Sequence, residues 1–264
     1  MLMVVKNQIR ISCLSVKYAL MREMLNKVTF FTNIIFMILN NASMIIQWII
    51  LYSLRDDVGG YSFKQVLLLW GLAAAIYGFS RFFFKRAFSL SDVINNGKLD
   101  SYLVQPKNVL LSVILTDVEV SAIGDMLYGY IMLFLYGVTL ANFMLFSLFM
   151  VCGGLILTAI SVILSSFSFW FSKSDILADT GNSLMTNFAT YPDGIFKGIA
   201  KVLLFTLIPV GIVNYLPVKV ITKFNIHLFL VVIVVTILFV SLAFVIFYKG
   251  LKRYSSSNLM IARI

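Results

Sequence analysis

Long runs of apolar residues alternate with short polar segments along the chain. About 20 apolar residues in a helix cross a bilayer core of about 30 Å, and runs of this length recur. We expect spans at about 28–54, 65–84, 120–140, 143–171 and 228–247. A less apolar region holds one further crossing, at 176–191 or at 199–216. The pattern therefore predicts an all-α polytopic membrane protein with six transmembrane helices.

The composition agrees with this pattern. Of 264 residues, 61% are hydrophobic and 12% are charged, whereas soluble domains carry roughly 25% charged residues. The net charge of +10 is typical of basic cytoplasmic loops in a membrane protein, so we expect no nucleic-acid partner. There are two cysteines, and Cys152 lies inside an apolar run, which argues against a disulfide framework.

Basic residues predict the orientation in the membrane. Five lie in residues 1–27, five between Arg81 and Lys107, and four after the last span, against two in residues 55–64 and none in the hairpin expected at Ala141-Asn142. Loops rich in Lys and Arg stay in the cytoplasm. We therefore expect a multi-pass protein of the cell membrane with cytoplasmic N- and C-termini.

The residues before the first span predict an amphipathic helix at about 8–26. Apolar residues recur at helical spacing on one stripe, and the cations lie off it. The stripe consists of Ile11, Leu14, Tyr18, Met21 and Leu25. Such a helix lies in the headgroup region of the lipid bilayer. We divide the chain into a cytoplasmic interfacial segment, 1–27, and a transmembrane domain, 28–264.

A polar insert, 89–106, separates the second and third spans. Ser89 or Ser91 suits a helix N-cap, and Asn95-Asn96-Gly97 suits a left-handed C-cap. Leu99 to Gln105 then predicts another short helical turn, which Pro106 stops. The insert is either a short helix that docks into the groove of a partner or an ordinary interfacial loop.

Several spans carry polar residues that either line a pathway or hydrogen-bond between helices. One stripe follows the first span, and a second follows the fourth. These candidate residues are Asn40, Ser43 and Gln47 in the first, and Ser161 and Ser165 in the fourth. Asp125, within the third span, suits a cationic substrate or a coupling ion. Alternatively it pairs with Arg81 or Lys85, or lies near the cytoplasmic interface.

Motifs for chemistry are absent from the sequence. There is no P-loop for ATP, and the one histidine, His227, has no neighbouring ligands for a metal. Asp117 and Glu119 point to different sides of a helix, so they do not form a catalytic pair. A membrane-embedded enzyme or assembly factor is therefore poorly supported. An ion-coupled secondary transporter would need an internal repeat with matching broken helices, and none is visible.

Three motifs carry a family resemblance. They are Gly97-x-Leu99-Asp100-x-x-Leu103-x-x-Pro106, then Tyr191-Pro192 followed by Ile208-Pro209 and Tyr215-Leu216-Pro217, and the closing Gly250-Leu251-Lys252-Arg253-Tyr254-Ser255-Ser256. In this order they resemble the permease subunits of ABC-2-type ABC transporters. More narrowly, they resemble the branch of small six-span bacterial permeases that are encoded beside a separate ATPase and often a second permease.

The resemblance implies a type V exporter-like fold with a connecting helix at 8–26 and a coupling helix within 89–106. The residues implied in ATPase coupling are Leu90, Val93, Ile94, Gly97, Leu99, Asp100, Leu103 and Pro106. It favours 176–191 as the fifth span and 193–222 as a re-entrant outer hairpin. That hairpin would leave Lys197, Lys201, Lys219 and Lys223 outside, against the charge rule.

The resemblance also implies the function of an ATP-driven permease subunit. Its expected activity is export of an amphipathic drug, peptide or lipid-like substrate. The expected partners are cytoplasmic ABC ATPase subunits and a second permease, the same or a homologous chain. ATP and Mg²⁺ would bind in the ATPase, and this chain would carry no cofactor of its own.

Overall fold

The computed structural model describes residues 2–171, 174–206 and 208–255. Their regular structure is helical, and they contain no strand beyond one isolated bridge between Val58 and Tyr61. Ser256, the last residue of the closing motif, and Arg263, one of the basic residues of the tail, lie outside the described residues.

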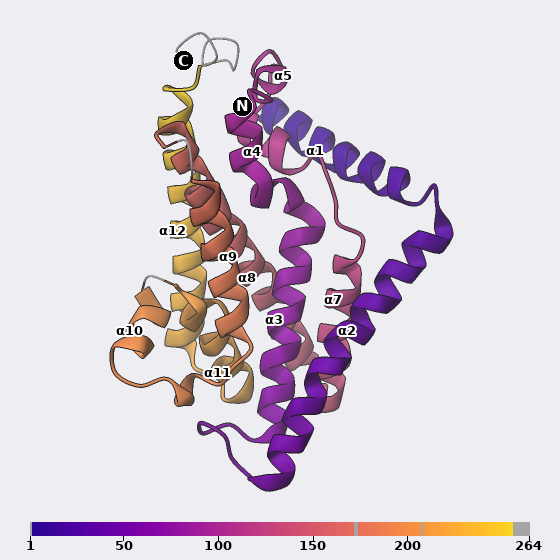
Figure 1. Cartoon of the computed structure of the whole chain (residues 1–264), viewed down its shortest axis with the longest axis vertical. Helices are drawn as coiled ribbons and strands as arrows, with labels where there is room; N and C mark the ends of the chain where they lie inside the picture. The colour runs from indigo at the N-terminus through magenta and orange to yellow at the C-terminus, as the bar shows by residue number, and fades with distance from the viewer. Residues whose placement is uncertain (1, 172–173, 207, 256–264) are drawn as a thin grey trace.

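The helices follow one another with short connections, as Figure 1 shows. The elements are α1 (Leu2–Glu23), α2 (Lys27–Leu54), α3 (Phe63–Phe84), η1 (Lys85–Ser89), α4 (Leu90–Asn95), α5 (Asp100–Leu103), α6 (Val109–Ile114), α7 (Ala122–Tyr136), α8 (Leu140–Ser166), η2 (Phe167–Phe169), α9 (Asp175–Ala189), η3 (Asp193–Ile195), α10 (Ile199–Thr206), η4 (Gly211–Tyr215), α11 (Leu216–Thr222) and α12 (Ile226–Leu251). Of these, η4 is a π-helix.

Helix α3 lies at the centre of the bundle (Figure 1). Its small residues allow α7 to approach closely, because a Cβ on Gly71 would meet Met132 and one on Gly78 would meet Asp125. Gly129 of α7 lies equally close to Ala75. Small residues at the contact between helices are typical of membrane bundles. The buried core therefore centres on α3, α7 and α8.

Four helical segments are long and apolar enough to cross a membrane. They are Lys27–Leu54, Phe63–Asn95, Leu140–Phe169 and Ile226–Leu251, and the bent pair Ile199–Thr206 with Gly211–Thr222 makes up to five if it counts as one span. Helices α7 and α9 have 15 residues each. The described residues thus form an all-α polytopic membrane fold. The four long segments coincide with the spans predicted at 28–54, 65–84, 143–171 and 228–247, whereas the spans predicted at 120–140 and 176–191 fall on the shorter helices α7 and α9.

The turn between α7 and α8 differs from the prediction. The sequence placed it at Ala141-Asn142, but the chain turns at Gly137, whose φ is +134°. Thr139 is the N-cap of α8, and its hydroxyl accepts a hydrogen bond from the Asn142 amide. Ala141 and Asn142 are therefore already helical, because the cap forms two residues earlier.

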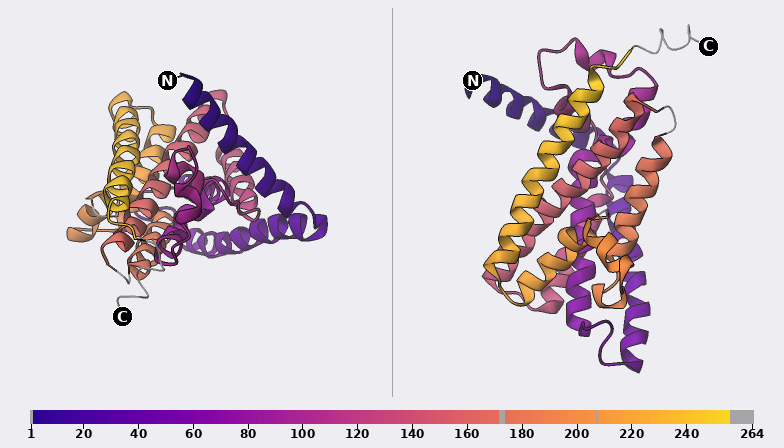
Figure 2. Two further views of the ribbon diagram at one scale, coloured as in Figure 1. Left: turned by 90° about the horizontal axis from the view of Figure 1, so that it is seen from above. Right: turned by 90° about the vertical axis from the view of Figure 1, so that its left-hand side faces the viewer.

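The two ends of the bundle differ in what they carry. One end, the terminal end, has α1, α4, α5 and the end of α12 (Figure 1). The opposite end has α10, α11 and the 55–62 loop (Figure 1). Helix α1 lies across the terminal end (Figure 2), and apolar residues of its predicted stripe, Tyr18 and Met21, are 64% and 51% exposed. These exposed side chains are suited to a bilayer interface.

Candidate functional site

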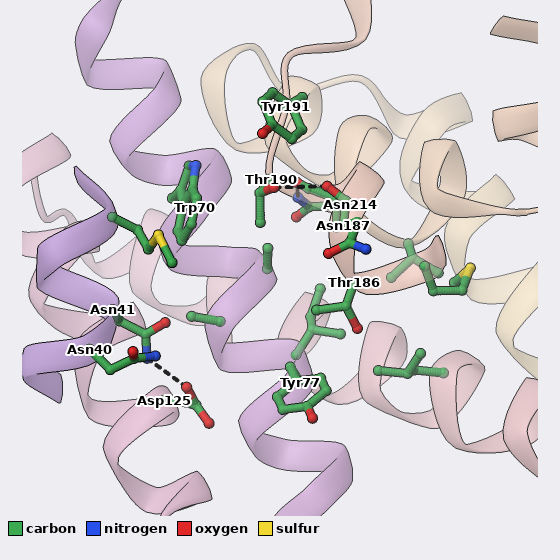
Figure 3. Close-up of a pocket in the computed structure, with 18 of the residues that line it drawn as sticks. Asn40, Asn41, Trp70, Tyr77, Asp125, Thr186, Asn187, Thr190, Tyr191 and Asn214 are labelled. Carbon is green, nitrogen blue, oxygen red and sulfur yellow. Dashed lines mark hydrogen bonds between the residues drawn. The ribbon is translucent and has the colours of Figure 1, made fainter. Parts of the chain in front are cut away.

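A cavity of about 450 Å³ opens between α2, α3 and α9. Figure 3 shows Asp125 and Asn41 in the lower left of the view, Thr190 and Asn214 in the upper right, and Trp70 across from Thr190. The α9 side of the cavity is polar. Helix α9 and the residues just after it supply Thr186, Asn187, Thr190 and Tyr191. The volume is within the roughly 300–1,000 Å³ range of small-molecule sites.

Asp125 is held in this cavity by α2. Its side chain is 3% exposed, and its Oδ1 accepts a 2.6 Å hydrogen bond from Asn41 Nδ2. The same Asn41 nitrogen donates to the Met37 carbonyl at 3.1 Å. Of the alternatives for Asp125, the pairing with Arg81 or Lys85 does not occur among the ion pairs of the described residues. Arg81 instead lies 3.6 Å from Glu119 and over the ring of Phe88.

Asn214 forms the end of the cavity opposite Asp125. It lies in the π-helix η4 and is fully buried. Its Nδ2 donates to the Ala189 carbonyl at 2.7 Å and to the Leu69 carbonyl at 3.2 Å. Two carbonyl acceptors fix which amide atom is nitrogen. π-Helical turns often occur at functional sites.

The predicted pathway residues divide into two groups. Asn40, Gln47 and Asp125 line the cavity, whereas Ser43, Ser161 and Ser165 do not. The Ser43 hydroxyl donates to the Asn40 carbonyl of its own helix. Ser161 donates to Asn182 of α9 at 2.6 Å, which is a contact between helices.

A second hollow of about 330 Å³ continues from this cavity toward the terminal end. The two share Tyr77, Thr186 and Asn187. Arg81 and Asp179 add opposite charges to the second hollow. The polar face of α9 therefore borders both hollows.

The predicted insert folds into a compact corner at the terminal end. Helix α4 ends in a Schellman motif, because the Lys98 amide donates to the Val93 carbonyl and the Gly97 amide to the Ile94 carbonyl. Gly97 has φ +67°, as its place in the predicted C-cap requires. Ser89 is the N-cap residue of α4, but its side chain makes no capping hydrogen bond. Helix α5 ends at Leu103, before Pro106.

The insert residues implied in coupling lie on two different sides. Four of them face the protein interior: Leu90, Val93, Ile94 and Leu99, each at most 3% exposed. They pack in the core and offer a partner no surface. Leu103 is 41% exposed, and its neighbour Val104, which the sequence analysis did not single out, is 83% exposed. Leu103 and Val104 are therefore the large apolar side chains that the insert offers to a partner, and we call them the tip of the insert.

The insert is tied to the segment that follows α12. The Tyr254 hydroxyl donates to Asp100 Oδ1 at 2.9 Å, and the Tyr254 ring lies edge-on to Phe169. Burial, then the hydrogen bond to Asp100 and its charge, raise the pKa of Tyr254 to about 12. The phenol therefore stays protonated at neutral pH and remains a donor.

Helix α1 is tied to the chain after the insert. Gln8 Oε1 accepts from the Asn108 amide at 3.1 Å, and Arg22 donates to Asp117 at 2.6 Å. Arg86 approaches Asp117 from the other side at 3.7 Å. The start and the end of α1 are thus both linked to the segment 108–117.

An ionic cluster around the buried Asp193 joins the 55–62 loop, η3, α10 and α11. Asp193 is 3% exposed. It accepts hydrogen bonds from the Tyr61 hydroxyl at 2.7 Å and from Lys219 Nζ at 2.9 Å, and Lys201 Nζ lies at 3.4 Å. Burial would raise the pKa of Asp193, but the bonds from Lys219 and Tyr61 and the two lysine charges outweigh it and hold the pKa below its usual value.

In the described residues, no group of three or more His, Cys, Asp or Glu side chains could hold a metal ion. No curated protein and no solved structure matches the chain. The model of one protein family, described as ABC-2 family transporter protein, matches residues 21–258. This match includes the spans, the insert and both hollows. The chain belongs to the ABC-2 transporter family.

Proposed function

We propose that this chain is the transmembrane permease subunit of an ATP-driven ABC transporter, energised by a separate ATPase that binds ATP and Mg²⁺. The observation that carries the proposal is the tip of the insert. A Schellman turn and four buried apolar side chains hold the insert rigid, and Leu103 and Val104 stay exposed beyond it. A stiff element with an apolar tip suits docking into a groove.

The membrane topology belongs to the same proposal. The six crossings are α2, α3, α7, α8, α9 and α12, with the terminal end in the cytoplasm. Helix α9 is the fifth crossing, and the residues from α10 to α11, whose axes differ by 76°, form the re-entrant outer hairpin. Residues 1–27 are the interfacial segment, and residues 28–264 are the transmembrane domain.

Closure of the ATPase would reach the spans through the contacts of the insert. Tyr254 links the insert to the segment that follows α12, and Asp117 links η1 to α1 through Arg86 and Arg22. The cavity between α2 and α9 would be the substrate path, completed by a second permease of the same or a homologous sequence. Export of an amphipathic substrate is the direction that the family resemblance favours.

The experiment is purification of the tagged chain from its native membranes in a mild detergent, with ATPase activity measured in the eluate. Leu103→Asp with Val104→Asp places two carboxylates on the tip, and we expect a loss of at least about tenfold in co-purified activity. Val138→Asp with Phe224→Asp is the matched control, because both residues are exposed and far from the insert in sequence. This control should retain the activity.

Two results would contradict the proposal. The first is that no ATPase co-purifies with the wild-type chain. The second is that the tip variant co-purifies with as much ATPase activity as the control variant. A secondary transporter predicts the first result, since it has no ATPase partner. A membrane-embedded enzyme predicts it too.

A further inference from the structure

Three buried polar atoms around the main cavity have no hydrogen-bond partner. They are Asp125 Oδ2, Trp70 Nε1 and Asn214 Oδ1. The residues are 3%, 8% and 0% exposed, and all three line the same cavity. Buried polar atoms are nearly always paired, because an unpaired group loses its hydration without compensation. Ten such atoms occur in the described residues, and three of them belong to residues that line this one cavity, which makes it a candidate site for a polar ligand.

Asp125 determines the charge of that ligand. The described residues that line the cavity include no Lys, Arg or His, and Asp125 is the one charged side chain among them. No salt bridge to Asp125 forms within the described residues. Acidic groups at membrane depth are costly and generally face a partner or a polar cavity. The missing partner of Asp125 is therefore a cation.

The geometry favours an organic ammonium over a bare metal ion. A hard metal ion needs about six oxygen ligands. The Asn41 side chain directs its nitrogen, and not its oxygen, at the carboxylate, so it adds no oxygen ligand beside Asp125. One carboxylate oxygen remains available, and one N–H donor of an ammonium group is enough to satisfy it.

The rest of the cavity suits the apolar body of such a cation. Met37, Met44 and Met185 supply flexible thioethers, which adapt to irregular apolar shapes. Trp70 and Tyr77 supply aromatic rings, and the faces of such rings attract cations.

We propose that the cavity binds the ammonium group of an amphipathic organic amine at Asp125, with the apolar part of the amine against the methionines and Trp70. Asn214 Oδ1 accepts a hydrogen bond from a second polar group of the ligand at the far end. This inference rests on the proposed function, because the cavity is a transport site only if the chain is a permease. It names the substrate class as a primary or secondary amine with an apolar body.

The test uses monodansylcadaverine, a fluorescent primary amine with an aromatic body. The full chain is placed in phosphatidylcholine nanodiscs, whose headgroup has no N–H donor, and binding is followed by dansyl fluorescence. The N-acetylated probe keeps the body and loses the ammonium. We expect the amine to bind at least about tenfold more tightly than its acetylated form, as one charged hydrogen bond implies.

Asp125→Asn is the matching variant, since it keeps an oxygen for Asn41 and removes the charge. Its affinity for the amine should fall by about tenfold, to that of the acetylated probe. Asp56→Asn removes one exposed carboxylate outside the cavity, and its affinity should equal that of the wild type. Equal binding of the two probes to the wild-type chain would overturn the inference, whether or not the variants fold. So would an unchanged affinity in a folded Asp125→Asn variant.

Two sources could supply the ammonium group, a soluble amphiphile or the ethanolamine headgroup of a lipid. Adding phosphatidylethanolamine to the nanodiscs separates them: competition with the probe identifies the lipid, and no competition identifies the soluble amine. The ATPase pull-down separates this inference from the proposed function. Selective amine binding without ATPase association would support the amine site and contradict the permease proposal. ATPase association without selective amine binding would support the permease proposal and contradict the amine site.

Discussion

Asp193 and Asp125 are both 3% exposed, yet their surroundings differ completely. Asp193 receives Tyr61 and Lys219, with Lys201 close by, so both of its oxygens are bonded. Asp125 receives only Asn41 in the described residues, and its second oxygen has no partner. A carboxylate whose two oxygens are both bonded stabilises the fold. A carboxylate with one unbonded oxygen can bind a ligand. The following four changes test this difference between the two aspartates.

The largest effect is expected from Gly194→Ala. A Cβ at this position would overlap the carbonyl of Gly59, so the 55–62 loop must move away from Asp193. The separation removes the Tyr61 contact as well as adding strain. We expect a loss of about 3 kcal/mol in stability, measured as a lower thermal unfolding midpoint in detergent. Gly60→Ala is the comparison for the same loop without overlap: Gly60 has a φ of +81°, so an alanine there strains the backbone, but its Cβ would meet nothing. Equal losses in the two variants would contradict this account.

Asp193→Asn should follow in size. The amide keeps one acceptor oxygen, so either Tyr61 or Lys219 loses its bond, and both lysines lose their countercharge. Because Lys219 and Lys201 can turn toward water, we expect a loss of about 2 kcal/mol rather than that of a fully buried pair. Thermal unfolding measures it, and Asp179→Asn is the control, since Asp179 is exposed. A variant as stable as the control would show that the cluster does not hold the opposite end together.

The effect of pH should be smaller and has a definite sign. The pKa of Asp193 is lower in the folded chain than in the unfolded chain. Its contribution to stability is therefore present above the ordinary carboxyl pKa of about 4 and is lost as pH falls through the lower folded value. The difference in unfolding midpoint between the wild type and Asp193→Asn should shrink in acid. A difference that stays constant down to the acid range would refute this.

Asp125→Asn should have the smallest effect on stability, within about 1 kcal/mol of the wild type. The Asn41 bond survives, and the unpaired charge disappears. The unfolding midpoint should be unchanged or higher, in contrast to Asp193→Asn. A loss as large as that of Asp193→Asn would mean that both aspartates serve the fold.

Local patterns predicted much of the fold. Apolar runs located α2, α3 and α12, and the Asn95-Asn96-Gly97 pattern located a true left-handed cap. Backbone propensity and hydrophobic length act over a few neighbouring residues, so they can be read directly. The side of the insert that faces the core was not readable, because it depends on how α4 packs against α8.

The candidate site was predicted only in part. Asn40, Gln47 and Asp125 were singled out, but Asn41, which bonds Asp125, was not. The two lie 84 positions apart, and nothing local links them. The polar face of α9 could have been predicted, because Asp179, Ser183, Thr186 and Thr190 recur at helical spacing. It was missed because the region is only weakly apolar, which left its status as a membrane span open. Asn214 lines the cavity from the π-helix η4, and no local sequence pattern predicted a π-helix there.

The length of α2 has a consequence for the choice of membrane. Its 28 residues, at a rise of about 1.5 Å each, span about 42 Å, well beyond a hydrocarbon core of about 30 Å. A helix this long relieves hydrophobic mismatch by tilting, and Figure 1 shows α2 leaning away from α3 toward its N-terminal end. Because α2 carries Asn41 and one wall of the cavity, bilayer thickness should set the width of the site. Amine affinity should therefore vary among nanodiscs of different acyl length, and a constant affinity would show that α2 does not respond to thickness.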